Sequence, residues 1–115
     1  MKISVIGTGY VGLVTGACFA NMGYEVCCAD VLPKKIDSLK KGVIPFFEPG
    51  LADIVGRTLE SKNLFFTSDA EAPSSFADVI FICVGTPQDD SGKPDLSSLD
   101  EYFVQLINTL KQDKK

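Results

Sequence analysis

The chain has 115 residues, of which 45% are hydrophobic and 23% are charged, and its 11 Lys and Arg against 15 Asp and Glu give a net charge of −4. This length allows one domain at most, and the composition is that of a globular protein rather than a disordered or collagenous chain. The acidic balance, with no run of Lys or Arg longer than two residues, argues against nucleic acid as a partner.

Residues 2–30 are predicted to form a strand, a helix and a second strand. The β-branched run 2–6 ends at Gly7, and residues 10–22 follow with apolar side chains at helical spacing. Those side chains are Val11, Val14, Cys18 and Met22. Gly23 is placed to end the helix, and the apolar run 25–30 begins a new strand. This βαβ unit requires its two strands to be parallel and adjacent.

Helices and strands continue to alternate beyond this unit. We expect a helix from Pro33 to Lys41, an apolar loop over 43–47 and a helix from Pro49 to about Ser61. One face of that second helix is apolar, with Leu51, Ile54, Val55 and Leu59. A strand over 63–67, a helical turn ending at Phe76 and a strand over 78–84 follow. Because residues 78–84 are apolar almost throughout, we expect them to be buried on both faces of a sheet.

The C-terminal part is predicted to hold a polar loop at 91–94, an amphipathic helix over 96–110 and a solvated lysine-rich end at 111–115. The pair Phe46–Phe47 fits either the core or a surface that another domain covers.

Residues 3–24 carry no charge, so a membrane span has to be considered. Five glycines interrupt the segment, and those at 7 and 9 would break a spanning helix and the apolar region of a signal peptide. The cysteines lack metal-ligand spacing and there is no His, so the sequence offers no zinc pattern. Because the cysteines lie in apolar runs, we expect four small buried apolar side chains rather than disulfides, as in a cytoplasmic protein. They are Cys18, Cys27, Cys28 and Cys83.

The segment 7–12 reads Gly-Thr-Gly-Tyr-Val-Gly and matches the GxGxxG pattern of dinucleotide-binding folds. Gly7 would turn the chain sharply, Gly9 would let the backbone approach a pyrophosphate, and Gly12 would let helix and strand pack closely. Asp30 follows the second strand, where a carboxylate accepts both hydroxyls of an adenosine ribose and repels a 2′-phosphate. The pattern therefore favours NAD over NADP, although Lys34 and Lys35 lie nearby. A glycine turn chosen for packing, with a solvated Asp, is the alternative.

The predicted elements fit a Rossmann-like parallel sheet of strand order 3-2-1-4 with flanking helices. Ligands bind such sheets where the strand order reverses, at the carboxyl ends of the strands. The loops at that point are residues 7–12 and 85–87, so Thr86 is a candidate hydrogen-bond partner of the cofactor. A strand-ending Thr-Pro turn explains the same residues equally well by spacing.

Four segments together resemble the UDP-glucose/GDP-mannose dehydrogenase family, and within it the members that oxidise UDP-glucose to UDP-glucuronate. The segments are Ile6–Gly12, Asp30 with Lys35, Glu48–Leu51 and Asp78–Pro87, and they span nearly the whole chain in order. The resemblance implies that NAD contacts the loop 7–12, that Asp30 and Lys35 hold the adenosine ribose, and that residues 84–86 line the crevice. The implied cofactor residues are Gly7, Gly9, Tyr10, Val11, Gly12, Asp30, Lys35, Val84, Gly85 and Thr86.

The resemblance also implies what the chain lacks. Members of this family pass two hydrides from the primary alcohol of a nucleotide sugar to two NAD molecules, through a thioester on a cysteine. That cysteine and the residues that assist it in catalysis would lie beyond position 115. No residue of this chain is therefore expected to be catalytic, and binding of the UDP-sugar would need the absent domain. Residues 1–115 are interpreted as the N-terminal part of an NAD-binding Rossmann domain.

The truncated sheet would leave strand 78–84 as an apolar edge, which is a template for pairing. We therefore expect the chain to pair with another copy, to exchange elements with it, or to be a fragment of a longer polypeptide. A stand-alone regulatory NAD sensor is the alternative from another functional class. A flavin or S-adenosylmethionine site is a third possibility, by fold analogy alone.

Overall fold

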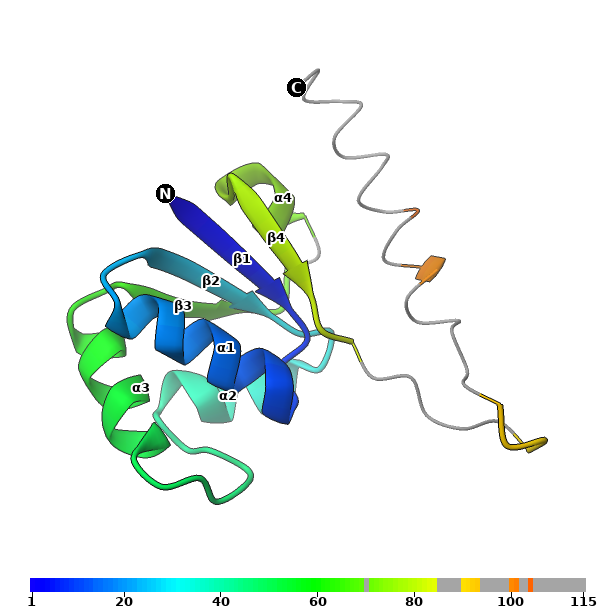
Figure 1. Ribbon diagram of the computed structural model, residues 1–115, viewed down its shortest axis with the longest axis horizontal. Helices are drawn as coiled ribbons and strands as arrows, with labels where there is room; N and C mark the ends of the chain where they lie inside the picture. Colours follow the sequence, from blue (N-terminus) through cyan, green and yellow to red (C-terminus); the bar gives the residue numbers. More distant parts are fainter. Residues whose placement is uncertain (70, 85–89, 94–99, 102–103, 105–115) are drawn as a thin grey trace.

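The computed structural model describes residues 1–69, 71–84, 90–93, 100–101 and 104 of the chain (Figure 1). Its elements in chain order are β1 (Lys2–Ile6), α1 (Tyr10–Asn21), β2 (Glu25–Ala29), α2 (Pro33–Lys40), α3 (Leu51–Glu60), β3 (Leu64–Thr67), α4 (Ala72–Phe76) and β4 (Val79–Ile82). Each predicted element up to residue 84 is present, with ends that differ by a few residues at most. The helix predicted over 96–110 lies largely outside the described residues, as do Gly85 and Thr86.

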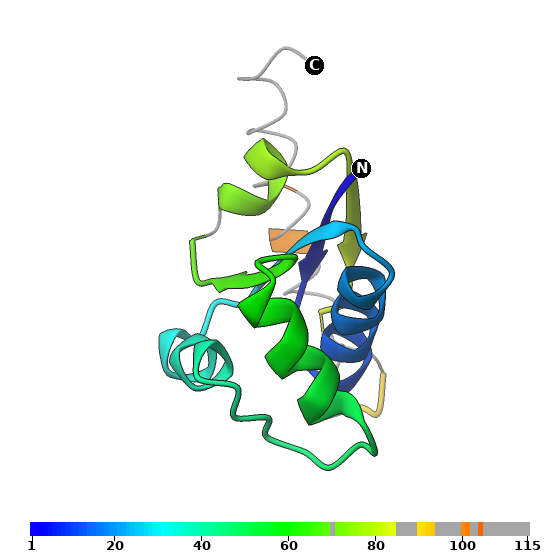
Figure 2. The same ribbon diagram turned by 90° about the vertical axis from the view of Figure 1, so that its left-hand side faces the viewer.

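The four strands form one parallel sheet in the order β3-β2-β1-β4, as predicted from the sequence. Helices α1 and α3 lie side by side on one face, α4 covers β1 and β2 on the opposite face, and α2 lies beside β3 (Figure 2). The strand order reverses between β1 and β4, and at that point the carboxyl ends of both strands reach the turn that follows β1. In this architecture the reversal is where ligands bind.

The core lies between the sheet and the pair α1 and α3. In β1 and β2 every residue after the first is buried, because both faces of these central strands are covered by helices. Leu13 of α1 is fully buried among them, and burial of a side chain of this size stabilises the fold by about 2 kcal/mol. The buried cluster comprises Ile3, Val5, Leu13, Ala17, Ala20, Val26, Cys28, Ile36, Leu39, Leu51, Val55, Leu64 and Phe66.

The face of α1 that packs on the sheet differs from the one expected. Val11, Met22 and Cys18 are exposed, and Val14 is half-buried. The buried face consists instead of Gly12, Leu13, Gly16, Ala17 and Ala20. Small side chains let the helix axis approach the strands closely: a Cβ at Gly16 would collide with the sulfur of Cys28. The expectation that all four cysteines are buried was therefore wrong for Cys18, and Cys83 is only partly buried.

β4 is also less buried than predicted. Val79 is 38% exposed and Phe81 is 36% exposed, because β4 has β1 on one side and no strand on the other among the described residues. The ring of Phe81 lies 5.3 Å from that of Phe19 in α1, centroid to centroid. The expectation of a strand buried on both faces was wrong, whereas the expectation that this strand forms an edge agrees with the described sheet.

None of the helices in the described part of the chain is long and apolar enough to cross a membrane.

Candidate cofactor-binding site

The turn between β1 and α1 contains two glycines that the structure leaves no room to replace. Gly7 has a positive φ of 102°, and a Cβ there would lie 2.5 Å from the carbonyl oxygen of Cys83. A Cβ on Gly12 would overlap the carbonyl oxygen of Gly7. Gly7 also donates its amide to the carbonyl of Ala29 at 2.7 Å. This turn is therefore held tightly between β2, β4 and the first turn of α1.

Gly9, by contrast, faces open space. No atom lies within 4 Å of the position that a Cβ would take there, and its backbone is extended, with φ −72° and ψ −167°. It is the N-cap of α1, and its carbonyl accepts the first helical hydrogen bond, from Leu13 at 2.9 Å. The turn thus presents bare backbone at the one glycine that the motif reserves for close approach of a phosphate.

The N-terminus of α1 is open to an anion. The first helical bond comes from Leu13, so the amides of Tyr10, Val11 and Gly12 have no acceptor within the helix. No side chain caps this end, and the first turn contains no acidic residue. No residue of α1 itself therefore compensates the partial positive charge of its N-terminus, which favours a bound pyrophosphate. Val11 has its side chain 64% exposed, so its contribution to such a site is its amide.

The two residues named for the ribose lie together. Asp30 follows β2 directly, and Lys35 lies in the first turn of α2 with its Nζ 3.5 Å from Oδ2 of Asp30. The hydroxyl of Thr8 donates to the same Oδ2 at 2.7 Å, and the amide of Thr8 donates to it at 3.0 Å. The amide of Leu32 donates to Oδ1 at 3.2 Å. The carboxylate is therefore fixed at the mouth of the glycine turn.

These contacts set the charge of Asp30. Burial acts to raise the pKa of its carboxyl, but the hydrogen bonds from Thr8 and Leu32 and the positive charge of Lys35 outweigh burial and lower it below its ordinary value of 3.8. Asp30 is consequently ionised at neutral pH, as recognition of a ribose diol requires.

This pKa shift predicts how stability depends on pH. A carboxyl whose folded pKa lies below its unfolded value stabilises the fold above the unfolded value and loses that contribution as the pH falls through the folded one. We expect the melting temperature of the wild-type chain to fall relative to that of Asp30→Asn as the pH is lowered from about 5 to about 3. Thermal unfolding of both proteins across this range measures the difference, and parallel pH profiles would contradict it.

Tyr10 is tied to a different segment. Its hydroxyl donates to Oε2 of Glu48 at 2.7 Å, and its ring lies 5.2 Å from that of Phe46. The hydrogen bond to Glu48 is the main cause that raises the pKa of Tyr10 above 10.0. Tyr10 therefore joins the start of α1 to the loop that precedes α3.

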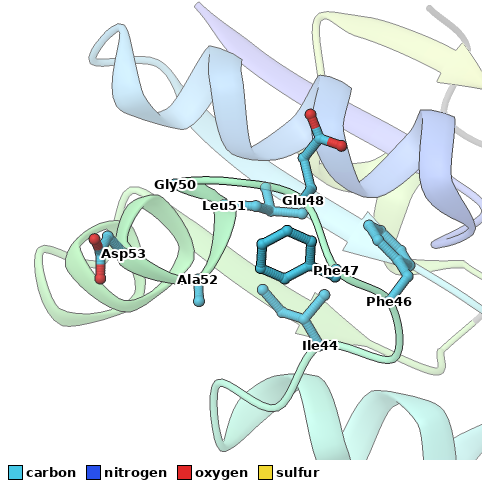
Figure 3. A pocket seen from close by; sticks show the side chains of 8 residues that line it. All are labelled: Ile44, Phe46, Phe47, Glu48, Gly50, Leu51, Ala52 and Asp53. Atoms are coloured by element: carbon cyan, nitrogen blue, oxygen red, sulfur yellow. The ribbon is translucent and has the colours of Figure 1, made fainter.

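That loop borders a hollow of about 240 Å³ beside the start of α3. Ile44, Phe46 and Phe47 line it, and the carboxylate of Glu48 is directed toward α1 (Figure 3). The two phenylalanines differ: Phe46 packs against the core, whereas Phe47 is 87% exposed. The sequence identified Glu48–Leu51 only as the opening of a helix, and α3 indeed begins at Leu51 with Gly50 as its N-cap.

On the β4 side, the structure brings Val84 next to the glycine turn. Its amide nitrogen lies 3.1 Å from the position of a Cβ on Gly7, so the chain leaving β4 runs directly against the turn leaving β1. Gly85 and Thr86 follow Val84 and lie outside the described residues.

The site thus gathers Gly7, Gly9, Tyr10, Val11, Gly12, Asp30, Lys35 and Val84 at the carboxyl ends of β1, β2 and β4. Thr8 and Glu48 belong beside them, and the sequence analysis gave neither a role in the site: Thr8 was only an unassigned position of the glycine motif, and Glu48 was only part of the segment that opens a helix. Their contacts join residues 22 and 38 positions apart, respectively, which no local pattern reveals. In the described part of the chain, no group of three or more His, Cys, Asp and Glu side chains is placed to hold a metal ion.

Open backbone at Gly9, uncapped amides at α1 and an ionised Asp30 match the pyrophosphate and ribose of a dinucleotide. Comparison with known proteins agrees: the model of the UDP-glucose/GDP-mannose dehydrogenase family, NAD binding domain, matches residues 1–115. UDP-glucose 6-dehydrogenase TuaD of Bacillus subtilis is 52% identical over 96 residues, which are 84% of this chain and 21% of that protein.

Solved structures agree in fold. GDP-mannose dehydrogenase of Pseudomonas aeruginosa, determined as a ternary complex, superposes with a TM-score of 0.95 at 34% identity, over 100% of this chain and 26% of that one. UDP-glucose dehydrogenase of Pyrobaculum islandicum superposes with a TM-score of 0.90 at 35% identity, over 96% of this chain and 26% of that one. The chain therefore spans about a quarter of the length of the proteins that it matches.

Proposed function

This chain belongs to the UDP-glucose/GDP-mannose dehydrogenase family, whose NAD-binding domain it matches over its whole length, and on that premise we propose that it holds NAD for the oxidation of UDP-glucose to UDP-glucuronate. Bound NAD would accept the hydride that leaves the primary alcohol of the sugar. The observation that carries the proposal is the ionised Asp30, fixed beside a glycine turn whose Gly9 has open space in front of it.

Each described residue has a distinct task in this proposal. The amides of Tyr10, Val11 and Gly12 donate to the pyrophosphate, which approaches over Gly9. Asp30 accepts from the hydroxyls of the adenosine ribose, and Lys35 donates to the same sugar. Gly7 and Gly12 bind nothing themselves, and their lack of a side chain keeps the turn closed against Cys83.

The sugar nucleotide needs more than these residues. We propose that the catalytic cysteine and the UDP-sugar site belong to the part of the relatives' length that this chain does not match. The 115 residues alone would then bind the cofactor without oxidising a sugar. The pairing of chains through the β4 edge and the cytoplasmic location stay predictions.

The alternative of a regulatory sensor gains no support, since the relatives named above are dehydrogenases. The contact between Tyr10 and Glu48 gives a structural role to the segment Glu48–Leu51, which carries part of the resemblance to the dehydrogenases. A flavin or S-adenosylmethionine site is likewise not favoured, because the matched domain binds NAD.

The test is calorimetric titration of the chain with NAD and with NADP. We expect saturable binding of NAD and weaker binding of NADP, because the charge of Asp30 repels the 2′-phosphate. Asp30→Ala removes the acceptor of charge-assisted hydrogen bonds and should weaken NAD binding by about tenfold or more.

Asp37→Ala is the matched control, because Asp37 is an exposed acid on the neighbouring helix α2. It removes the same charge without touching the turn and should leave NAD affinity within about twofold of wild type. A folded chain that does not bind NAD, or an Asp30→Ala variant that binds it as wild type does, would contradict the proposed function.

A further inference from the structure

Thr8 lies between the first two glycines of the turn, at a position where the glycine pattern makes no demand. Thr8 is fully buried, although it stands between two glycines. Both of its donors, the hydroxyl at 2.7 Å and the amide at 3.0 Å, reach the same oxygen, Oδ2 of Asp30. Any residue other than proline would supply the amide, whereas the hydroxyl depends on the side chain. The hydroxyl bond is therefore specific to the sequence of this chain.

The remaining partners of Asp30 hold it more weakly. Lys35 approaches Oδ2 at 3.5 Å from a side chain that is 29% exposed, and the amide of Leu32 reaches Oδ1 at 3.2 Å. The amide of Asp30 itself donates to the carbonyl of Thr67 on β3 and fixes only the backbone. The charged contact of the carboxylate in the described structure is Lys35, and Lys34 lies next to it on the exposed side of α2.

Without the hydroxyl, Oδ2 of Asp30 would lose its shortest contact and keep the amide of Thr8 at 3.0 Å, while Oδ1 would keep the amide of Leu32 at 3.2 Å. With one donor fewer, the carboxylate would rotate more readily toward Lys35 or toward solvent, since an Asp side chain has two free torsions. Two lysines at the start of α2 would be left beside the ribose, and cations there favour a 2′-phosphate. The orientation of Asp30 is therefore what decides between a diol and a phosphate at this place.

We propose that Thr8 is a specificity-determining positioning residue: its hydroxyl holds the carboxylate of Asp30 in the orientation that accepts the ribose hydroxyls of NAD and repels the 2′-phosphate of NADP. The inference rests on the proposed function, because it takes Asp30 as the residue that meets the ribose. Thr8 itself touches no cofactor in this scheme and acts through Asp30 alone.

The experiment compares Thr8→Val, Thr8→Ser and wild type by titration with NAD and NADP. Valine keeps the branched shape and loses the donor, so we expect NAD affinity to fall about tenfold while NADP affinity stays or rises. The preference for NAD then falls by about tenfold or more. Serine keeps the donor and should restore both affinities. Loss of the donor also raises the pKa of Asp30, so the acid limb of NAD binding should move to higher pH in Thr8→Val.

Two further variants separate this role from a merely structural one. In an Asp30→Ala background, Thr8→Val should change NAD affinity by less than about twofold, because the partner through which Thr8 acts is gone. Thr58→Val removes an equally buried hydroxyl, which donates to the carbonyl of Ile54 at 2.7 Å within α3. It controls for the loss of a buried hydroxyl elsewhere and should leave the preference for NAD unchanged.

Each outcome decides the inference. It is overturned if Thr8→Val keeps the wild-type preference, weakens both cofactors equally, or still acts in the Asp30→Ala background. If Thr8→Val does not fold, Thr8→Ala makes the same comparison, because it removes the hydroxyl without placing a methyl group against the carboxylate. If Asp30→Ala binds NAD as wild type does, the proposed function itself fails, and that result is distinct from a failure of Thr8 alone.

Discussion

Gly12→Ala is expected to destabilise the chain by about 3 kcal/mol or more, which is a large fraction of the stability of a typical domain. The added Cβ would overlap the carbonyl oxygen of Gly7, lie 2.9 Å from its carbonyl carbon, and stand 3.3 Å from the Cβ of Cys83. The first two atoms belong to the backbone of Gly7, and the amide of Gly7 donates a hydrogen bond to the carbonyl of Ala29 in β2 at 2.7 Å. Relief therefore requires α1 to move away from the sheet, which would open the packing around Leu13.

Urea unfolding followed by circular dichroism measures this loss, and Gly56→Ala is its matched control. Gly56 lies inside α3, and a Cβ there would meet no atom within 4 Å. The same substitution at that place should stabilise the chain by up to about 1 kcal/mol, because alanine favours a helix interior over glycine. A Gly12→Ala variant as stable as wild type would mean that α1 is not held against the turn as closely as the structure has it.

The sequence was most informative where one residue type has one local consequence. Three features depend only on residues that are close together in the chain. They are the β-branched run at 2–6, the positive φ of Gly7 and Gly23, and Pro33 at the start of α2. The strand order also followed from local facts, since right-handed crossovers leave few arrangements for alternating strands and helices. The fold class and most element boundaries could be predicted for this reason.

Prediction failed where the outcome depends on which neighbour comes close. Hydropathy favoured Val11 and Met22 for the buried face of α1, but apart from Leu13 the residues on that face are small, such as Gly16 and Ala17, and they let the helix lie close to the sheet. The pattern of β4 likewise could not reveal that its outer side is partly exposed. In the site, Asp30 was predictable from its distance to the glycines. The hydrogen bond from the hydroxyl of Thr8 to Asp30 was not predictable, because it depends on side-chain torsions at the ends of two strands.

The second glycine of the turn should behave in the opposite way to Gly12. Gly9→Ala is expected to change stability by less than about 1 kcal/mol, because its Cβ would enter open space and its backbone angles suit any residue. NAD affinity should nevertheless fall by about 30-fold or more, since that open space is where the pyrophosphate must approach the backbone. Calorimetric titration with NAD and urea unfolding of the same sample measure the two quantities.

The contrast between Gly9 and Gly12 tests the site more sharply than either substitution alone. If the turn merely packs the helix on the sheet, binding would be lost only in proportion to stability, and Gly9→Ala would be silent in both measurements. If the open backbone at Gly9 receives the pyrophosphate, a stable Gly9→Ala chain loses NAD while keeping its fold. Gly9→Ser sharpens the comparison further, because a serine N-cap should stabilise α1 while its side chain obstructs the same space. A more stable chain with weaker NAD binding is a result that packing alone does not produce.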